Sequence, residues 1–167
     1  MINRRFLLAS TAGLAAFAAL RWLGFPGKAE AAGKFEIEKT PEEWKRQLTP
    51  RQYYILREHG TERPFSSPLN KEKRKGIFAC AGCDLPLFAS ETKFESGTGW
   101  PSFYDHLPNA VSKTEDRTMM MVRTEIHCRR CGGHLGHVFD DGPKPTGLRY
   151  CMDGDGMVFK PADGSSS

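Results

Sequence analysis

The sequence predicts a mainly antiparallel β domain preceded by two short helices. Its 167 residues suit one domain with a substantial core. Two helix-start signals lie between residues 40 and 52, whereas from Gly76 onward short apolar runs alternate with turn residues. Four of the five cysteines form two Cys-x-x-Cys pairs in the strand-rich part, which indicates a metal site there.

The first 31 residues have the features of an export signal, so we exclude residues 1–31 from the predicted domain. Arg4 and Arg5 precede an uncharged apolar stretch, 6–20, and Ala29-Glu30-Ala31 offers a cleavage site. The stretch is shorter than the ~20 residues that span a bilayer. The paired arginines resemble a twin-arginine signal, although the usual residue before the phenylalanine is missing, and a Sec route is the alternative. We expect a periplasmic protein with no stable membrane association after cleavage.

Two helices are expected after a polar lead-in over residues 32–39. Thr40 and Glu43 form a capping-box pattern with proline between them, which predicts a helix ending near Leu48. Thr49 and Gln52 repeat the pattern, which predicts a second helix from about 50 to 58 with Gly60 as its C-terminal cap. Side chains expected to pack these helices onto the body are Trp44, Tyr53 and Leu56.

Short strands are expected in the rest of the chain. The run 119–126, rich in methionine, predicts a core strand rather than an oxidation sensor. The other expected strands cover 76–80, 85–88, 138–139, 148–152 and 157–159. The predicted domain spans 40–160, and the Ser-rich segment 161–167 is expected to be a disordered tail.

The net charge of +4 is mild and spread along the chain. The densest basic run, 71–75, fits a solvated loop before a strand better than a nucleic-acid patch. We therefore expect no nucleic-acid partner.

The two cysteine pairs predict one structural zinc ion, Zn²⁺, held by Cys80, Cys83, Cys128 and Cys131. Four thiolates close the tetrahedral coordination shell, so no position remains for a substrate. The turns would be permitted by Gly82 and Gly132, and the wide spacing between the pairs predicts that the ion joins two distant hairpins. An alternative grouping joins Cys128 and Cys131 to His134 and His137, but its histidine spacing is too short and it leaves the first pair unused.

The fifth cysteine, Cys151, is a candidate reactive thiol. On a strand, Arg149, Cys151 and Asp153 would share one face, and the guanidinium would favour the thiolate. The alternative is a small buried apolar side chain.

Two further motifs suggest a site. His134 and His137 lie among three glycines next to the second cysteine pair, and imidazole can donate a proton near pH 7. Trp100 lies in a Gly- and Pro-containing loop, where its ring could form a pocket wall instead of part of the core.

These motifs occur in the same order in B-type peptide-methionine sulfoxide reductases, and the chain resembles that family over roughly residues 40–160. The motifs are Gly-Trp-Pro-Ser-Phe at 99–103, the two cysteine pairs, Gly-Gly-His-Leu-Gly-His-Val-Phe at 132–139 and Arg-Tyr-Cys at 149–151. The resemblance implies two antiparallel sheets with peripheral helices and a structural zinc. It also implies thiol-dependent reduction of methionine R-sulfoxide in proteins or peptides, through a sulfenic acid on the nucleophile.

The resemblance further implies the roles of single residues. Cys151 matches the nucleophile, and Trp100 matches the residue that packs on the substrate methyl group. The residues expected around the sulfoxide oxygen and the thiol are His134, His137, Asp141 and Arg149, with Phe139 in the substrate-binding set and Asp153 in the catalytic set.

Two departures from the family pattern matter. Asp153 replaces the usual asparagine, so its negative charge would oppose the thiolate. Thr98 stands where many members carry a resolving cysteine, so we expect direct reduction by an external, thioredoxin-like thiol. We expect a monomer. The alternatives are a non-catalytic zinc-ribbon-like interaction module and a Cys-x-x-Cys thiol oxidoreductase.

Overall fold

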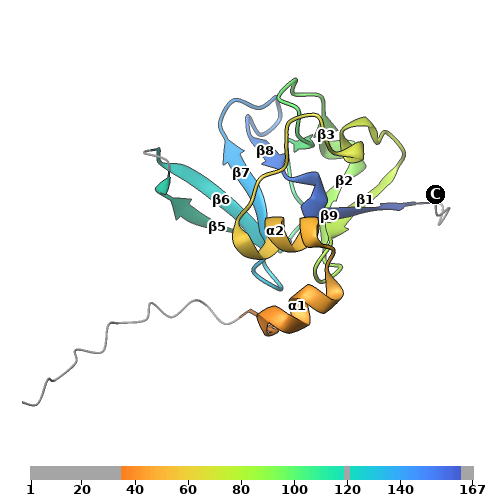
Figure 1. The fold of residues 1–167 in the computed structure, drawn as a ribbon. Coiled ribbons are helices and arrows are strands. Elements are labelled where there is room, and N and C mark those ends of the chain that lie inside the picture. The colour runs from red at the N-terminus through yellow and green to blue at the C-terminus, as the bar shows by residue number, and fades with distance from the viewer. Residues whose placement is uncertain (1–34, 119–120, 163–167) are drawn as a thin grey trace, which may run out of the picture. The chain divides into compact units, whose positions relative to one another are not determined.

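The computed structural model describes residues 35–118 and 121–162, which form two antiparallel sheets (Figure 1). The smaller sheet has the order β2-β1-β9, with β1 at Gly76–Cys80, β2 at Pro86–Ala89 and β9 at Met157–Pro161. The larger has the order β3-β4-β8-β7-β6-β5. Its strands are β3 (Lys93–Phe94), β4 (Ser102–Phe103), β5 (Val111–Asp116), β6 (Arg123–Cys128), β7 (His134–Phe139) and β8 (Arg149–Met152). The predicted mainly β fold is confirmed.

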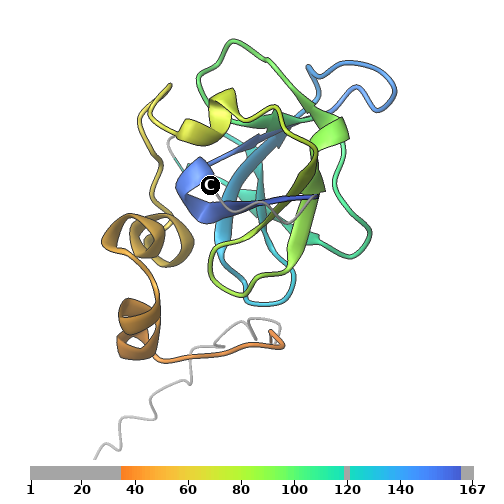
Figure 2. The ribbon, with the colours of Figure 1, turned by 90° about the vertical axis from the view of Figure 1, so that its right-hand side faces the viewer.

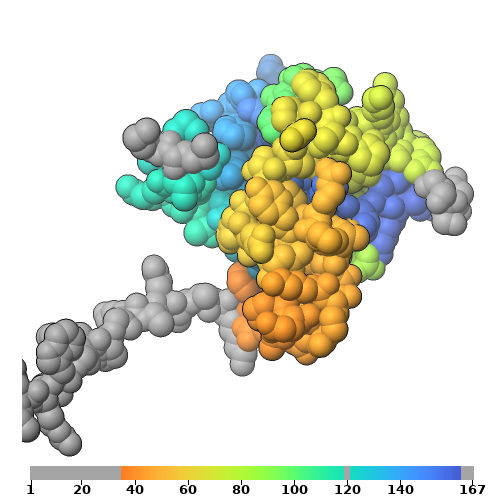
Figure 3. Space-filling model, in the orientation of Figure 1, coloured from red at the N-terminus to blue at the C-terminus, as the bar shows by residue number. Residues whose placement is uncertain are grey.

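The two N-terminal helices, α1 (Pro41–Gln47) and α2 (Pro50–Glu58), begin at the predicted capping boxes. Trp44 and Leu56 are buried and Tyr53 is half-buried against the core, as expected. The end of α2 differs from the prediction, because His59, not Gly60, adopts the left-handed conformation with φ 52°. The amide of Gly60 then donates to the carbonyl of Tyr54, which closes the helix. Both helices lie at the surface in the space-filling view, coloured orange (Figure 3).

Aromatic side chains from both sheets lie in the hydrophobic core. Figure 2 shows the strands of the two sheets from the side. Phe78 and Phe88 of the smaller sheet meet Phe103 of the larger at ring-centroid distances of 4.9 and 4.4 Å. All three rings are fully buried. Since a buried aromatic side chain contributes about 1.5–3 kcal/mol, this cluster holds the sheets together and fixes the buried face of β8, which carries Tyr150 and Met152.

Several strands differ from the sequence prediction; for example, β7 begins at His134 and not at Val138. Strand β6 begins at Arg123, later than expected. Met121 and Val122 precede the strand and are exposed, so they are not core residues. Met119 and Met120 of the expected strand lie outside the described residues. Strand β5 was not expected, since its sequence Val-Ser-Lys-Thr-Glu-Asp is polar and occupies a sheet edge. Strand β9 continues to Pro161, into the expected tail.

The expected export signal, 1–31, lies outside the described residues, as do 32–34 of the lead-in and 163–167 of the tail. None of the helices within the described part of the chain is long and apolar enough to cross a membrane.

Candidate active site

Strand β8 places Cys151 between two neighbours that carry site residues. Cys151 pairs with His137 of β7 on one side and with Ser102 of β4 on the other. Directly opposed residues point to the same face of a sheet, with Cβ atoms about 4.5–5.5 Å apart. His137 and the half-buried Cys151 therefore share one face, and β4 brings the Trp100 loop beside them.

An open cavity of about 150 Å³ lies on this face. Of the residues singled out from the sequence, those that line it are Trp100, His137, Phe139, Cys151 and Asp153. The other lining residues, which sequence reasoning missed, are Thr61, Arg123 and Gly136. Gly136 has φ 139°, and a Cβ there would lie 2.2 Å from the carbonyl oxygen of Cys151, so only glycine allows β7 to approach β8 this closely.

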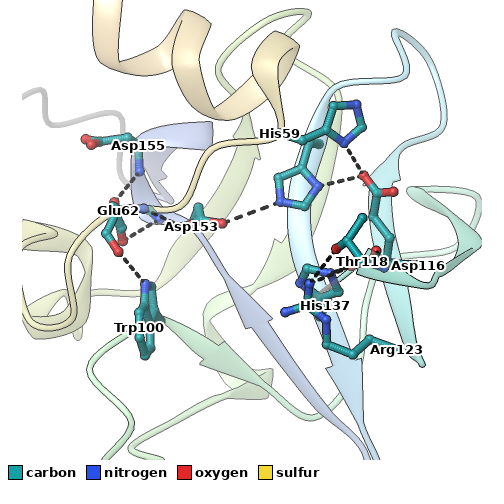
Figure 4. Close-up of polar contacts among 12 residues, drawn as sticks. His59, Glu62, Trp100, Asp116, Thr118, Arg123, His137, Asp153 and Asp155 are labelled. Carbon is teal, nitrogen blue, oxygen red and sulfur yellow. Dashed lines mark hydrogen bonds and ion pairs between the residues drawn. The ribbon is translucent and has the colours of Figure 1, made fainter. Parts of the chain in front are cut away.

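Trp100 is held by Glu62, a buried residue in the loop that follows α2 (Figure 4). The indole Nε1 of Trp100 donates to the Glu62 carbonyl oxygen at 3.1 Å. The Glu62 amide donates to Oδ1 of Asp153 at 2.9 Å, while its carboxylate accepts from the amides of Gly154 and Asp155 at 2.8 and 3.0 Å. One loop residue thus connects the pocket wall to the segment directly after Cys151.

Burial dominates the electrostatics of the thiol and raises the pKa of Cys151. Thr98, whose Oγ1 lies 3.9 Å from the sulfur, and Arg149 both favour the thiolate, whereas Asp153 opposes it. Arg149 therefore acts on the thiolate in the expected direction, but desolvation outweighs the guanidinium, so the resting thiol is protonated.

Asp153 is buried, and burial raises the pKa of its carboxyl to about 7. Its Oδ2 lies 3.7 Å from Nε2 of His134. A group with this pKa, on the wall of the cavity beside Cys151, holds a proton on a substantial fraction of molecules at neutral pH.

The two motif histidines occupy different places. His137 lines the cavity and its Nε2 is 2.9 Å from Oδ2 of Asp116. Burial lowers the pKa of His137, so the ring is mainly neutral. His134 is buried behind the cavity wall, with Nδ1 2.6 Å from Glu125; within the described part of the chain its Nε2 has no hydrogen-bond partner. Although burial opposes ionisation, hydrogen bonds from His134 and His59 hold the pKa of Glu125 well below its usual range.

Arg149 and Asp141 form a bidentate ion pair with both N–O distances at 2.8 Å. The guanidinium also stacks 4.5 Å from the ring of Phe139. Asp141 is 61% exposed and neither residue lines the cavity, so this pair forms its outer support rather than its wall.

The four cysteines of the Cys-x-x-Cys pairs meet where the β1–β2 and β6–β7 turns come together, and their sulfurs lie within 4.8 Å of one another. The Cys80–Cys131 and Cys83–Cys128 sulfur distances, 3.8 and 3.4 Å, are far longer than the ~2.05 Å of a disulfide. They match the roughly 3.7 Å between ligands on a tetrahedron with 2.3 Å zinc–sulfur bonds. The four residues are a possible metal site that fits zinc. The alternative grouping is not formed, because the two histidines bond to carboxylates.

Local structure around the cysteine cluster is only partly as predicted. Gly132 has φ 67° and provides the second turn, but in the first turn Asp84, with φ 63°, takes the left-handed conformation instead of Gly82. Arg57 of α2 donates to the carbonyl oxygen of Cys131 at 3.1 Å and lies 3.8 Å from its sulfur. This cation connects α2 to the cluster and offsets negative charge on the thiolates.

Comparison with known proteins agrees with the geometry. A family model described as the SelR domain matches residues 48–161, well over half of the chain. Curated relatives named peptide methionine sulfoxide reductase MsrB are more than half identical to it. The chain belongs to the MsrB family. The Agrobacterium fabrum relative is 58% identical over 127 residues, covering 75% of this chain and 94% of the relative.

Two other MsrB relatives are similarly close. The match to the Methanosarcina barkeri protein is 57% identical over 125 residues, 74% of this chain and 88% of the relative. The match to the Pseudomonas putida protein is 54% identical over 131 residues, 78% of this chain and 98% of the relative. These matches extend over nearly the whole length of each MsrB relative.

Proposed function

We propose that this chain reduces methionine R-sulfoxide in proteins or peptides to methionine, with Cys151 as the nucleophile. The observation that carries the proposal is the pairing of Cys151 with His137 on a cavity that Trp100 and Asp153 also line. Membership of the MsrB family supports methionine sulfoxide as the substrate.

The substrate's methyl group would lie against the Trp100 ring, with the sulfoxide sulfur facing Cys151. A sulfoxide sulfur becomes electrophilic when its oxygen is protonated or hydrogen-bonded. The thiol of Cys151 is protonated at rest, and Asp153 with its pKa of about 7 carries a further proton on the same cavity wall. These groups can therefore supply both the nucleophile and the acid without a bound cofactor at the reacting atoms.

The chemistry balances as an oxygen transfer. The sulfoxide gains two electrons and loses its oxygen, while Cys151 becomes a sulfenic acid. One external thiol then forms a mixed disulfide with Cys151 and releases water, and a second thiol frees Cys151 and leaves as a disulfide. Thr98, which lies beside the Cys151 sulfur, has no thiol to take the place of the external reductant.

One zinc ion held by Cys80, Cys83, Cys128 and Cys131 would be structural, because four thiolates leave no open coordination position. A bound ion would join the turn of the smaller sheet to that of the larger sheet. The thiolates would then be unavailable for turnover, which distinguishes this protein from a Cys-x-x-Cys oxidoreductase.

We also propose that the chain is exported by the twin-arginine route, with Arg4 and Arg5 as part of its signal. Outside the cytoplasm it would function as a monomer with a thioredoxin-like reductant. Fractionation of cells that express Arg4→Lys/Arg5→Lys tests the route. The variant should remain in the cytoplasm, and unchanged export would exclude the twin-arginine route.

Replacement of Cys151 by serine tests the function against a non-catalytic zinc-binding module. If the chain is the proposed reductase, Cys151→Ser should lose turnover of methionine sulfoxide and keep its fold and its metal. Unchanged turnover in this variant would remove Cys151 from the reaction.

A further inference from the structure

A second cluster of metal-ligating side chains lies outside both the cavity wall and the four-cysteine site. His59 at the end of α2, Glu125 on β6 and His134 on β7 bring one ligand atom each to within 4.8 Å of the others. Oε1 of Glu125 is 2.9 Å from Nδ1 of His59 and 2.6 Å from Nδ1 of His134. Figure 4 shows His59 turned toward this group.

The donor set is the one that zinc uses in open sites. Two imidazole nitrogens and one carboxylate oxygen leave a fourth, water-accessible position on a tetrahedral ion. Bonds of about 2.1 Å place such ligands roughly 3.3 Å apart. The observed contacts would therefore widen by less than about 1 Å when an ion replaces the two N–H protons that now point at Oε1.

Exposure and charge both allow an ion to enter. The His59 side chain is 64% exposed, whereas those of Glu125 and His134 are 14% and 3% exposed. The ion would thus meet an exposed ligand at the surface and two buried or half-buried ligands behind it. The Glu125 carboxylate, which accepts from both imidazoles through Oε1, already faces the place that the ion would occupy.

We propose that His59, Glu125 and His134 form a second, exchangeable site for a divalent zinc-like ion, and that an ion bound there slows the reductase. The first part rests on the geometry alone, and the second rests on the proposed function. The four-cysteine site is closed and structural, whereas this one has three ligands and opens to solvent at His59.

The inhibition follows from the position of His134. Its Nδ1 would bind the ion, while its Nε2 lies 3.7 Å from Oδ2 of Asp153. The 2.6 Å contact between His134 and Glu125 must widen to admit the ion, so the His134 ring would shift against Asp153, which lines the cavity. That shift would disturb the cavity wall beside Cys151 and slow the reaction.

Zinc binding is measured by titration calorimetry on zinc-loaded protein that carries Cys151→Ser, so that the free thiol cannot act as a ligand. One further zinc per chain should bind. Adding His59→Asn should weaken this binding at least tenfold, because it removes one of three ligands, and asparagine tolerates the left-handed backbone at this position. His106→Asn, which removes a histidine outside the cluster, should leave the binding unchanged.

The activity readout uses the same substitution in protein with an intact Cys151. His59 does not line the cavity, so His59→Asn should keep the basal rate while losing inhibition by added zinc, and a chelator should restore the inhibited wild type. Absence of a second zinc, or binding with unchanged affinity in His59→Asn, would overturn the site. Binding that requires His59 without any effect on rate would overturn the inhibition only.

Discussion

At the scale of single residues, Asp153 adds to the burial that opposes ionisation of Cys151. Its pKa of about 7 means that it is ionised over the higher pH range in which the Cys151 thiol titrates. We predict that Asp153→Asn lowers the Cys151 pKa and speeds alkylation by about two- to fivefold at pH 8, because a negative charge beside the thiolate is removed. Site-specific mass spectrometry of iodoacetamide labelling against pH measures this change.

Asp155→Asn is the matched control for that experiment. Asp155 lies two residues after Asp153, forms an ion pair with Arg51 and does not line the cavity. Removing its charge should therefore leave the pH dependence of Cys151 labelling unchanged. An unchanged or raised Cys151 pKa in Asp153→Asn would show that the Asp153 carboxylate does not act on the thiol.

Thr98 bears on the proposed recovery of the oxidised enzyme by an external thiol. Its hydroxyl lies 3.9 Å from the Cys151 sulfur, and the other four cysteines cluster at the possible zinc site. After one turnover without reductant, we predict sulfenic acid on Cys151 alone, trapped with a dione probe and located by mass spectrometry. Thr98→Cys should instead trap an internal disulfide between positions 98 and 151. A wild-type disulfide between Cys151 and a zinc-site cysteine, formed with zinc release, would contradict the prediction.

At the scale of elements, the loop after α2 positions the pocket through Glu62. Its carboxylate accepts two backbone N–H groups at Gly154 and Asp155, and a glutamine there must turn its NH₂ toward one of these donors. We predict that Glu62→Gln lowers the free energy of unfolding by about 1–3 kcal/mol, measured in urea. It should also raise KM, because a loosened loop holds the backbone carbonyl of residue 62, the acceptor for Trp100, less firmly.

The control for Glu62 is Glu58→Gln on the exposed face of α2, which should change stability by less than about 0.5 kcal/mol. If Glu62→Gln matches this control in both stability and KM, Glu62 is not a positioning residue.

The elements that could be predicted from sequence were those defined by local chemistry. The capping boxes at Thr40 and Thr49 determined both helix starts, because each requires only residues within one turn. Strands β3 to β5 could not be predicted, since two of them contain two residues each and β5 is polar; pairing with a neighbouring strand, not local pattern, makes them strands.

The residues of the site show the same difference between features set by local sequence and features set by tertiary contacts. Cys151, Trp100 and the cysteine pairs stood out because their residue types and spacing carry chemistry by themselves. Glu62, Asp116 and Glu125 did not, because a carboxylate becomes informative only when folding buries it beside a partner from a distant element. The net direction of the Cys151 pKa shift could not be predicted for the same reason, since desolvation depends on the whole fold.

At the scale of the whole molecule, the cysteine cluster brings together turns of the two sheets, whose buried faces also meet in the hydrophobic core. We predict one zinc per chain by elemental analysis. Cys128→Ser should lose the metal and the cooperative thermal transition, because a closed thiolate site contributes directly to folding. Cys151→Ser should keep both. Finding no zinc, with disulfides within the two pairs, would contradict a structural ion.

The central claim is that the Cys151 thiol on β8, in a cavity that Trp100 and His137 line, reduces methionine R-sulfoxide. The most direct measurement is turnover of the separated R and S epimers of a methionine sulfoxide peptide, with dithiothreitol as reductant and Cys151→Ser as the inactive control. The account predicts turnover of the R epimer, little or none of the S epimer, and none of either in the variant. Reduction of the S epimer alone, or of neither epimer by folded, zinc-loaded protein, would contradict it.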